Sequence, residues 1–384
     1  MQEPVVILGS GLAGYNLARE FRKADKETPL VIVSRDDAGF YSKPMLSNAL
    51  AGGKTAAALV MKPAATMAAD LNASLMPRTE VRRIDTTART IELADGRTLA
   101  YRDLVLALGA DPIRVPLTGD AAGEVLSVND LDDYARFAES LEGVKTVALL
   151  GAGLIGCEFA NDLLARGIVP TVLDLADRPL SRLLPEAASA FLRQRLEAAG
   201  ARFRFGVAAE RVDRLPSGGL RVRLSDGSAI DVDLVLSAIG LRPRTALARD
   251  AGLAVNRGIV VDRELAASAP HVFAIGDCAE VEGLNLPYVM PLMNQARALG
   301  ATLAGNPTRL SYPAMPVTVK TPACPTVVCP PPQDAQGSWA CDDSEGGCEA
   351  RFQHADGRLL GFAVLGSATA RKQALAAQVP PLLG

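Results

Sequence analysis

The sequence predicts an α/β fold with two Rossmann-like parallel-sheet domains and a small α+β domain at its C-terminal end. Two observations predict the paired domains: a strand–glycine turn–helix segment near residue 5 recurs near residue 147, and later apolar runs also end in glycine. A third observation, the proline-rich composition after residue 311, sets the last part of the chain apart. The length of 384 residues suits two or three domains, at roughly 150 residues per domain.

The repeated segment is a four-residue apolar run followed by G-x-G-x-x-G. It reads VVILGSGLAG at 5–14 and VALLGAGLIG at 147–156, and each copy precedes a helical pattern and a second strand. Its glycines permit a tight turn, a close approach to a pyrophosphate, and close packing of helix on strand. One copy alone could be a plain structural turn, but two copies in this context predict two dinucleotide sites. The predicted contacts are Gly9, Ser10, Gly11, Leu12 and Gly14 in the first site, and Gly151, Gly153 and Gly156 in the second.

An acidic residue that binds the adenosine ribose is expected about 20 residues after such a turn. In the second unit this residue is Asp174, at the end of the strand TVLD. A carboxylate accepts hydrogen bonds from ribose hydroxyls and repels a 2′-phosphate, so we expect NADH to be preferred over NADPH. The alternative is a plain surface acid at a strand end. In the first unit the position is shifted, and we expect Ser34 or Arg35 to contact the adenosine.

Three further apolar strands end near candidate ligand positions. They cover 104–109, 234–241 and 272–277, and they contribute Gly109, Gly240 and Asp277. In open α/β sheets, ligands bind at the carboxyl ends of the strands.

The composition excludes several classes of protein. With 40 Lys and Arg against 43 Asp and Glu, the net charge of −3 argues against a nucleic-acid-binding protein. The two histidines exclude a His-rich metal site, and we expect no metal. The N-terminus lacks a basic region and a cleavage site, and no apolar stretch approaches the ~18 residues of a membrane span. We therefore expect a cytoplasmic protein.

Together these features resemble the pyridine nucleotide–disulfide oxidoreductase family of flavoproteins. Four segments, YSKPMLS (41–47), LIGCEFAND (154–162), YVMPL (288–292) and VTVKTP (317–322), are more closely similar to the bacterial NADH:rubredoxin reductases. The resemblance implies an FAD-binding domain at 1–112 and 240–310, an NADH-binding domain at 113–239, and a C-terminal domain at 311–384. It also places Val81, Val289 and Lys320 near FAD. The implied reaction passes hydride from NADH to FAD and then single electrons to rubredoxin, for alkane hydroxylation or oxygen detoxification.

The resemblance further implies catalytic roles for Lys43 and Glu158, which should meet near the flavin N5 and the nicotinamide. An ammonium group there would stabilise the anion that develops on the flavin, and the carboxylate would hold the ammonium. The alternative is a surface lysine and an acid favoured by the helix dipole.

The cysteines argue against a thiol relay. Disulfide reductases of this family keep two cysteines on the helix after the first glycine turn, whereas no cysteine precedes Cys157 here. Cys324 and Cys329 could form a metal site or a redox disulfide, but residues five apart in a strand point to opposite faces, which favours ordinary thiols. Cys157 and Cys278 are expected to be packing residues, and the roles of Cys341 and Cys348 stay open.

Other functions remain possible from the sequence: an NADH-dependent ferredoxin reductase, an NADH oxidase, or a non-catalytic FAD redox sensor. Because rubredoxins are small acidic proteins, a rubredoxin partner requires a local basic patch. Lys320, Arg297 and Arg244 are the candidates. The C-terminal domain is shorter than the dimerisation domain of the disulfide reductases, so the oligomeric state stays open.

Overall fold

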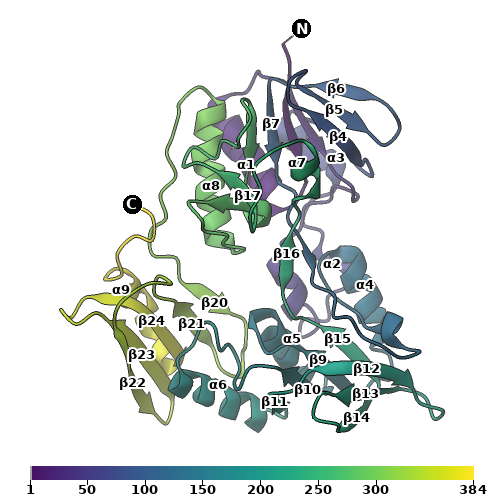
Figure 1. Ribbon diagram of the computed structural model, residues 1–384, viewed down its shortest axis with the longest axis vertical. Helices are drawn as coiled ribbons and strands as arrows, with labels where there is room; N and C mark the ends of the chain where they lie inside the picture. Colours follow the sequence, from purple (N-terminus) through teal and green to yellow (C-terminus); the bar gives the residue numbers. More distant parts are fainter. Residues whose placement is uncertain (1) are drawn as a thin grey trace.

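The computed structural model describes residues 2–384, which form two stacked lobes and a third lobe beside the lower one (Figure 1). The upper lobe is built on a five-stranded parallel sheet in the order β18-β7-β1-β2-β3. Its strands are β1 (Val5–Leu8), β2 (Leu30–Val33), β3 (Ser74–Met76), β7 (Asp103–Leu106) and β18 (Val272–Ala274). The sheet takes strands from both sides of residues 113–239, so the upper lobe is discontinuous in the sequence.

Two long helices of the upper lobe pack against each other. They are α1 (Leu12–Ala24) and α8 (Val289–Leu303). Their approach is close because α8 carries Gly300, where a Cβ would lie 3.0 Å from the backbone nitrogen of Phe21. A three-stranded antiparallel sheet completes this lobe, with β4 (Val81–Asp85), β5 (Thr90–Leu93) and β6 (Thr98–Ala100).

The lower lobe repeats this plan. Its parallel sheet has the order β11-β10-β9-β15, with β9 (Thr146–Leu150), β10 (Val169–Asp174), β11 (Arg202–Phe205) and β15 (Leu234–Ser237). A second three-stranded antiparallel sheet follows, with β12 (Ala209–Arg214), β13 (Leu220–Leu224) and β14 (Ala229–Val232). The main helices of the lobe are α4 (Leu131–Ser140), α5 (Leu154–Leu164) and α6 (Glu186–Ala198). The internal repeat seen in the sequence is therefore a repeat of the fold.

The chain passes between the lobes twice, in two short strands that pair with each other. These are β8 (Ala110–Pro112) and β16 (Leu241–Pro243), which are antiparallel. The remaining short elements are η1 (Lys43–Asn48), α2 (Ala56–Leu59), α3 (Ala64–Leu71), η2 (Ala122–Glu124), α7 (Ala246–Asp250), β17 (Ile259–Val261), η3 (Gly276–Cys278) and β19 (Ala279–Val281).

The third lobe is the small α+β domain that the sequence predicted. A five-stranded antiparallel sheet in the order β20-β21-β24-β23-β22 carries η4 (Ser367–Arg371) and α9 (Lys372–Ala376). Its strands are β20 (Val317–Val319), β21 (Thr326–Cys329), β22 (Ser338–Ser344), β23 (Gly347–Gln353) and β24 (Leu359–Gly366). One face of the sheet shares a hydrophobic core with α6, in which Val328 and Ala363 pack with Leu192. The third lobe is therefore joined to the lower lobe by apolar packing.

Two structural properties bear on the sequence-based expectations. Among residues 2–384, no helix is both long enough and apolar enough to cross a membrane. Within the same residues, His, Cys, Asp and Glu side chains form no group of three or more that could hold a metal ion.

Candidate functional site

The first glycine turn leaves an open cradle at the start of α1. Gly9 has φ +121°, and a Cβ there would lie 2.2 Å from the carbonyl oxygen of Ala107. A Cβ on Gly14 would lie 1.9 Å from the carbonyl oxygen of Gly9, so both positions require glycine. By contrast, nothing lies within 4 Å of a Cβ on Gly11. The helix has neither a side-chain cap nor an acid in its first turn, so its free N–H groups suit a phosphate.

The second glycine turn has the same construction at the start of α5. A Cβ on Gly151 would lie 2.7 Å from the carbonyl oxygen of Ala238, and one on Gly156 would lie 1.9 Å from that of Gly151. Gly153 again faces open space, and α5 has no side-chain cap. The structure therefore contains two cradles that fit the pyrophosphates of two dinucleotides.

The upper and lower lobes each have an acidic residue at the end of the second strand, and this residue accepts hydrogen bonds from the nearby glycine turn. In the lower lobe, Asp174 accepts hydrogen bonds from the backbone N–H of Ala152 at 2.6 Å and of Ala176 at 2.8 Å. Its carboxylate is thereby fixed at the edge of the turn, next to the exposed Leu175. This position is compatible with the predicted ribose contact.

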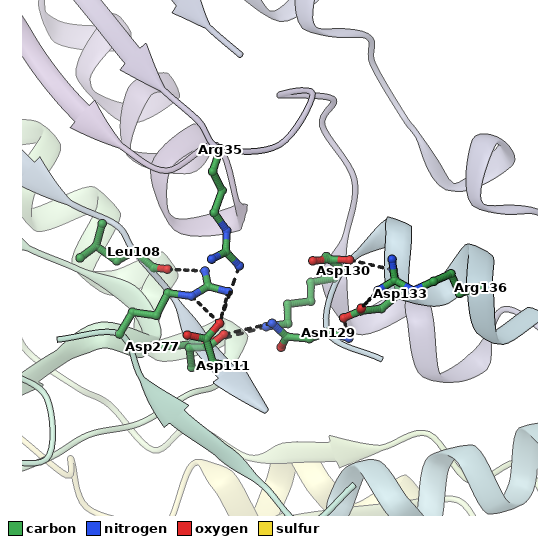
Figure 2. Close-up of polar contacts among 11 residues, drawn as sticks. Arg35, Leu108, Asp111, Asn129, Asp130, Asp133, Arg136 and Asp277 are labelled. Carbon is green, nitrogen blue, oxygen red and sulfur yellow. Dashed lines mark hydrogen bonds and ion pairs between the residues drawn. The ribbon is translucent and has the colours of Figure 1, made fainter. Parts of the chain in front are cut away.

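In the upper lobe the corresponding acid is Asp36, which the sequence reasoning missed. Asp36 Oδ1 accepts hydrogen bonds from Ser34 Oγ at 2.5 Å and from Ser10 Oγ at 2.9 Å. Arg35 instead extends toward Asp111, at 3.7 Å (Figure 2). The signal for Asp36 was present, because it is the first acid after the strand.

Lys43 and Asp277 meet at the carboxyl end of the upper sheet. Lys43 begins η1 and Asp277 lies in η3, and Lys43 Nζ is 4.0 Å from Asp277 Oδ2. Burial lowers the pKa of Lys43, although the nearby Asp277 carboxylate opposes this effect. A lysine with a lowered pKa is common at functional sites.

A salt-bridged arginine holds the two interlobe strands beside this pair. Arg244 donates hydrogen bonds to Asp111 Oδ1 at 2.7 Å and to the carbonyl oxygen of Leu108 at 2.7 Å. Arg35, Leu108, Asp111 and Asp277 converge in this region (Figure 2). The Arg244 guanidinium helps to keep the pKa of Asp111 below its usual range, against the effect of burial.

The expected pairing of Lys43 with Glu158 is wrong. Glu158 is fully buried on α5 and pairs with Lys320 Nζ. The same carboxylate accepts hydrogen bonds from the backbone N–H of Lys320 at 2.9 Å and from Ser47 Oγ at 2.5 Å. The reason is positional: Lys320 follows β20, which the third lobe brings against α5, while Lys43 lies on the Asp277 side of η1.

Two more polar residues of α5, which the sequence reasoning did not single out, fix its neighbours. Asp162 is buried and accepts hydrogen bonds from the backbone N–H of Leu50 at 2.9 Å and of Ala51 at 2.8 Å. Asn161 Oδ1 accepts one from the backbone N–H of Ala323 at 2.9 Å. With Glu158, they make α5 the point where all three lobes are joined.

The other predicted site residues lie beside the interlobe strands or in the upper lobe. Gly109 and Gly240 have φ +70° and +119° and flank the interlobe strands. Val81 begins β4 and packs against the core of the upper lobe. Val289 begins α8, with 43% of its surface exposed.

The cysteines are ordinary thiols. All six are free, and only Cys341 is exposed. Cys324 and Cys329 belong to different hydrophobic cores, so their side chains diverge, but Cys324 precedes β21 and the expected single strand through both residues is wrong. Burial raises the pKa of Cys329 and of Cys278 to about 11. Neither thiol has the lowered pKa of a reactive cysteine.

Comparisons with known proteins show which families share this architecture. Residues 3–300 match the family described as pyridine nucleotide-disulphide oxidoreductase. The chain belongs to this family. Residues 309–379 match a second family, described as rubredoxin binding C-terminal domain. The family resemblance and the fold class read from the sequence are thus confirmed.

Individual relatives match along nearly the whole chain. The chain is 50% identical to rubredoxin-NAD(+) reductase of Alcanivorax borkumensis, over 99% of both proteins. It is 39% identical to nitric oxide reductase FlRd-NAD(+) reductase of Aeromonas salmonicida, over 98% of this chain and 96% of the relative. Among solved structures, it is similar to a ferredoxin reductase from Rhodopseudomonas palustris, with a TM-score of 0.89, 28% identity, and coverage of 99% of this chain and 96% of that one.

Proposed function

We propose that this protein is an FAD-dependent NADH:rubredoxin oxidoreductase. The observation that carries the proposal is the match of residues 309–379 to the rubredoxin binding C-terminal domain, joined to a two-dinucleotide flavoprotein fold. The full-length similarity to a rubredoxin-NAD(+) reductase supports it. Bound FAD would supply the chemistry, because a flavin accepts a hydride and releases electrons one at a time.

The residues of the chain would hold the two nucleotides in order. The turn at Gly9, Gly11 and Gly14 would bind the FAD pyrophosphate, and Asp36 would take its ribose. The turn at Gly151, Gly153 and Gly156 would bind NADH, with Asp174 on the ribose. Lys43 would place a positive charge beside the flavin, where negative charge develops on reduction.

Electron delivery would not pass through cysteine. No cysteine precedes Cys157 in the chain, and η1 carries Lys43 and Ser47 where a disulfide relay would need thiols. This arrangement favours an acceptor that takes electrons directly.

The docking surface for an acidic acceptor would lie on α8 and the segment after it. Of the three basic candidates, Lys320 is paired with Glu158 and Arg244 with Asp111, which leaves Arg297. Arg297 lines a groove of about 210 Å³ with Arg309. No Asp or Glu occurs between residues 283 and 333. No carboxylate of this segment therefore neutralises Arg297 or Arg309, which favours an acidic partner.

Apolar side chains lie on the same helix. Val289 and Met290 are 43% and 42% exposed. Met290, Asn294 and Arg297 follow one another at helical spacing and share one face of α8. Exposed apolar groups beside cations are typical of an interface that is steered by charge and closed by apolar contact.

The domain limits and the location belong to the same proposal. We place the FAD-binding domain at 1–112 and 240–310, the NADH-binding domain at 113–239 and the C-terminal domain at 311–384. The β8–β16 pair, where the chain passes between lobes, supports the first two limits. Six free thiols support a reducing compartment, the cytoplasm.

A steady-state assay with NADH and a panel of acceptors tests the function. Rubredoxin should be reduced much faster than ferredoxin, oxygen or glutathione disulfide. Ferredoxin reduced as fast as rubredoxin would instead support a ferredoxin reductase, and fast oxygen consumption would support an NADH oxidase. Slow flavin reduction by NADH would indicate a redox sensor.

A further inference from the structure

A buried glutamine links the turn at Asp277 to a distant tyrosine. Gln295 lies on α8 with 3% of its surface exposed. Its Oε1 accepts a hydrogen bond from the backbone N–H of Gly276 at 2.7 Å, and its Nε2 donates one to the Tyr312 hydroxyl at 2.7 Å. An amide carries both an acceptor and donors, so this single side chain completes both contacts.

The turn held by Gln295 is tightly constrained. Gly276 has φ +75°, and a Cβ there would lie 2.8 Å from the side chain of Ala13 on α1. The next residue is Asp277, the partner of Lys43. A small displacement of Gly276 would therefore move the Asp277 carboxylate relative to Lys43.

The C-terminal end of the chain holds Tyr312. The Tyr312 backbone N–H donates to the carbonyl oxygen of Leu383 at 2.8 Å, and its carbonyl accepts from Leu382 at 2.8 Å. Arg263, in the upper lobe, donates to the carbonyl oxygen of Leu310 at 2.7 Å and to that of Gly384. Figure 1 shows the C-terminus close to the connection between α8 and β20. Both ends of the third lobe are thus fastened beside Gln295.

We propose that Gln295 and Tyr312 are positioning residues for FAD, and that residues 382–384 keep Tyr312 in place for this role. The chain of contacts runs from the tail through Tyr312 and Gln295 to Gly276. The inference rests on the proposed function, because Asp277 must face a bound flavin. It adds that Tyr312, which lies in the region matched to rubredoxin binding, helps to fix the turn at Gly276 and Asp277 through Gln295.

The first test measures the FAD dissociation constant of apoprotein variants. Gln295→Leu leaves the buried N–H of Gly276 without an acceptor, so FAD should bind about 10- to 100-fold more weakly. Gln295→Glu restores an acceptor for Gly276 and can accept from the Tyr312 hydroxyl, so it should recover much of the affinity. Tyr312→Phe removes one hydrogen bond and should weaken binding about 3- to 10-fold.

The matched control for Tyr312→Phe is Tyr101→Phe. Both tyrosines are fully buried in the core of the upper lobe, but the Tyr101 hydroxyl has no hydrogen-bond partner. Tyr101→Phe should leave the dissociation constant unchanged. Equal effects of the two substitutions would overturn the assignment.

The second test separates positioning from simple stabilisation. With FAD at saturation, Gln295→Leu and a chain ending at residue 381 should each change the visible absorption spectrum and the midpoint potential of the bound flavin. A purely structural role would lower the melting temperature of the apoprotein and leave both flavin properties at their wild-type values, which would overturn the proposal. If Gln295→Leu does not fold, Tyr312→Phe decides by the same two readouts.

The same experiments distinguish this inference from the proposed function. Wild-type protein that binds no FAD would refute the function itself. Wild-type protein that binds FAD, together with folded variants that match it in affinity, spectrum and potential, would refute only the positioning role.

Discussion

Lys320 contacts the Glu158 carboxylate through two of its groups. Its backbone N–H donates to Oε1 at 2.9 Å, and its ammonium pairs with Oε2. Glu158 is completely buried, whereas 23% of the Lys320 side chain is exposed. A buried carboxylate is costly unless it is paired and hydrogen-bonded. The third lobe therefore supplies the ammonium group that pairs with the buried acid of α5 in the lower lobe.

We predict that Lys320→Met destabilises the folded protein. It removes the ammonium and leaves the buried Glu158 carboxylate with only neutral donors, which costs about 3 kcal/mol in the free energy of unfolding. Equilibrium unfolding in guanidinium chloride measures this free energy of unfolding for the variant and for the wild type. Glu158→Gln combined with Lys320→Met should recover part of the loss, because the buried charge is gone. A Lys320→Met protein as stable as wild type would contradict the role of the pair.

Lys43 should control the rate of flavin reduction. Lys43→Met removes the positive charge beside Asp277, and stopped-flow reduction by NADH should slow about 10-fold or more, as for loss of one stabilising charge. Lys43→Arg keeps the charge and is the matched control. If Lys43→Met is reduced as fast as wild type, the lysine has no part in this step.

The lowered pKa of Lys43 predicts a pH dependence. Burial lowers this pKa from 10.5, so the ammonium loses its proton at a lower pH than an ordinary lysine. The charged fraction therefore falls as pH rises through that lowered pKa, and flavin reduction should slow on the alkaline side before pH 10.5. Lys43→Arg should keep its charge and flatten the profile. An identical alkaline decline in Lys43→Arg would assign the titration to another group.

The sequence was sufficient for features that depend on local geometry. The glycine turns could be predicted because each one places strand, turn and helix within a short segment, and the steric limits on Gly14 and Gly156 come from the carbonyl oxygens of Gly9 and Gly151 in the same segment. The divergence of Cys324 from Cys329 was expected from the alternation of side chains along a strand, but β21 begins at Thr326, so Cys324 lies in the turn before the strand and its placement does not follow from that alternation.

The sequence was insufficient for contacts between distant segments. Glu158 and Lys320 are 162 residues apart, and no local pattern encodes how the third lobe packs on α5. The same limit explains why Asn161, Asp162 and Gln295 were missed. Each side chain accepts a hydrogen bond from a backbone N–H that belongs to another lobe or another element. Such residues look like ordinary helix positions until the packing is known.

Asp174 should set the preference for NADH. Asp174→Ala removes both the predicted ribose acceptor and the hydrogen bonds to Ala152 and Ala176, so the KM for NADH should rise about 10-fold or more. Replacing the exposed Leu175 with Arg in the same variant should favour NADPH, because a cation can pair with the 2′-phosphate.

The control for Asp174 is Asp177→Ala. Asp177 is an exposed acid of the same loop that pairs with Arg178. The Asp177→Ala substitution should leave the KM for NADH and the KM for NADPH unchanged. An NADH preference that survives Asp174→Ala would assign coenzyme selection to other residues.

Charge reversal on α8 should weaken docking of the acidic acceptor. Arg297→Glu places a negative charge in the groove shared with Arg309, and kcat/KM for rubredoxin should fall about 10-fold at low salt, with a smaller effect at high salt where charges are screened. Reduction of ferricyanide, a small acceptor that needs no protein docking, should not change. Arg83→Glu is the matched control, because Arg83 is an exposed arginine on β4 of the antiparallel sheet, beside Asp85. Equal losses from the two reversals would mean that net charge alone governs the rate, and that α8 is not the docking surface.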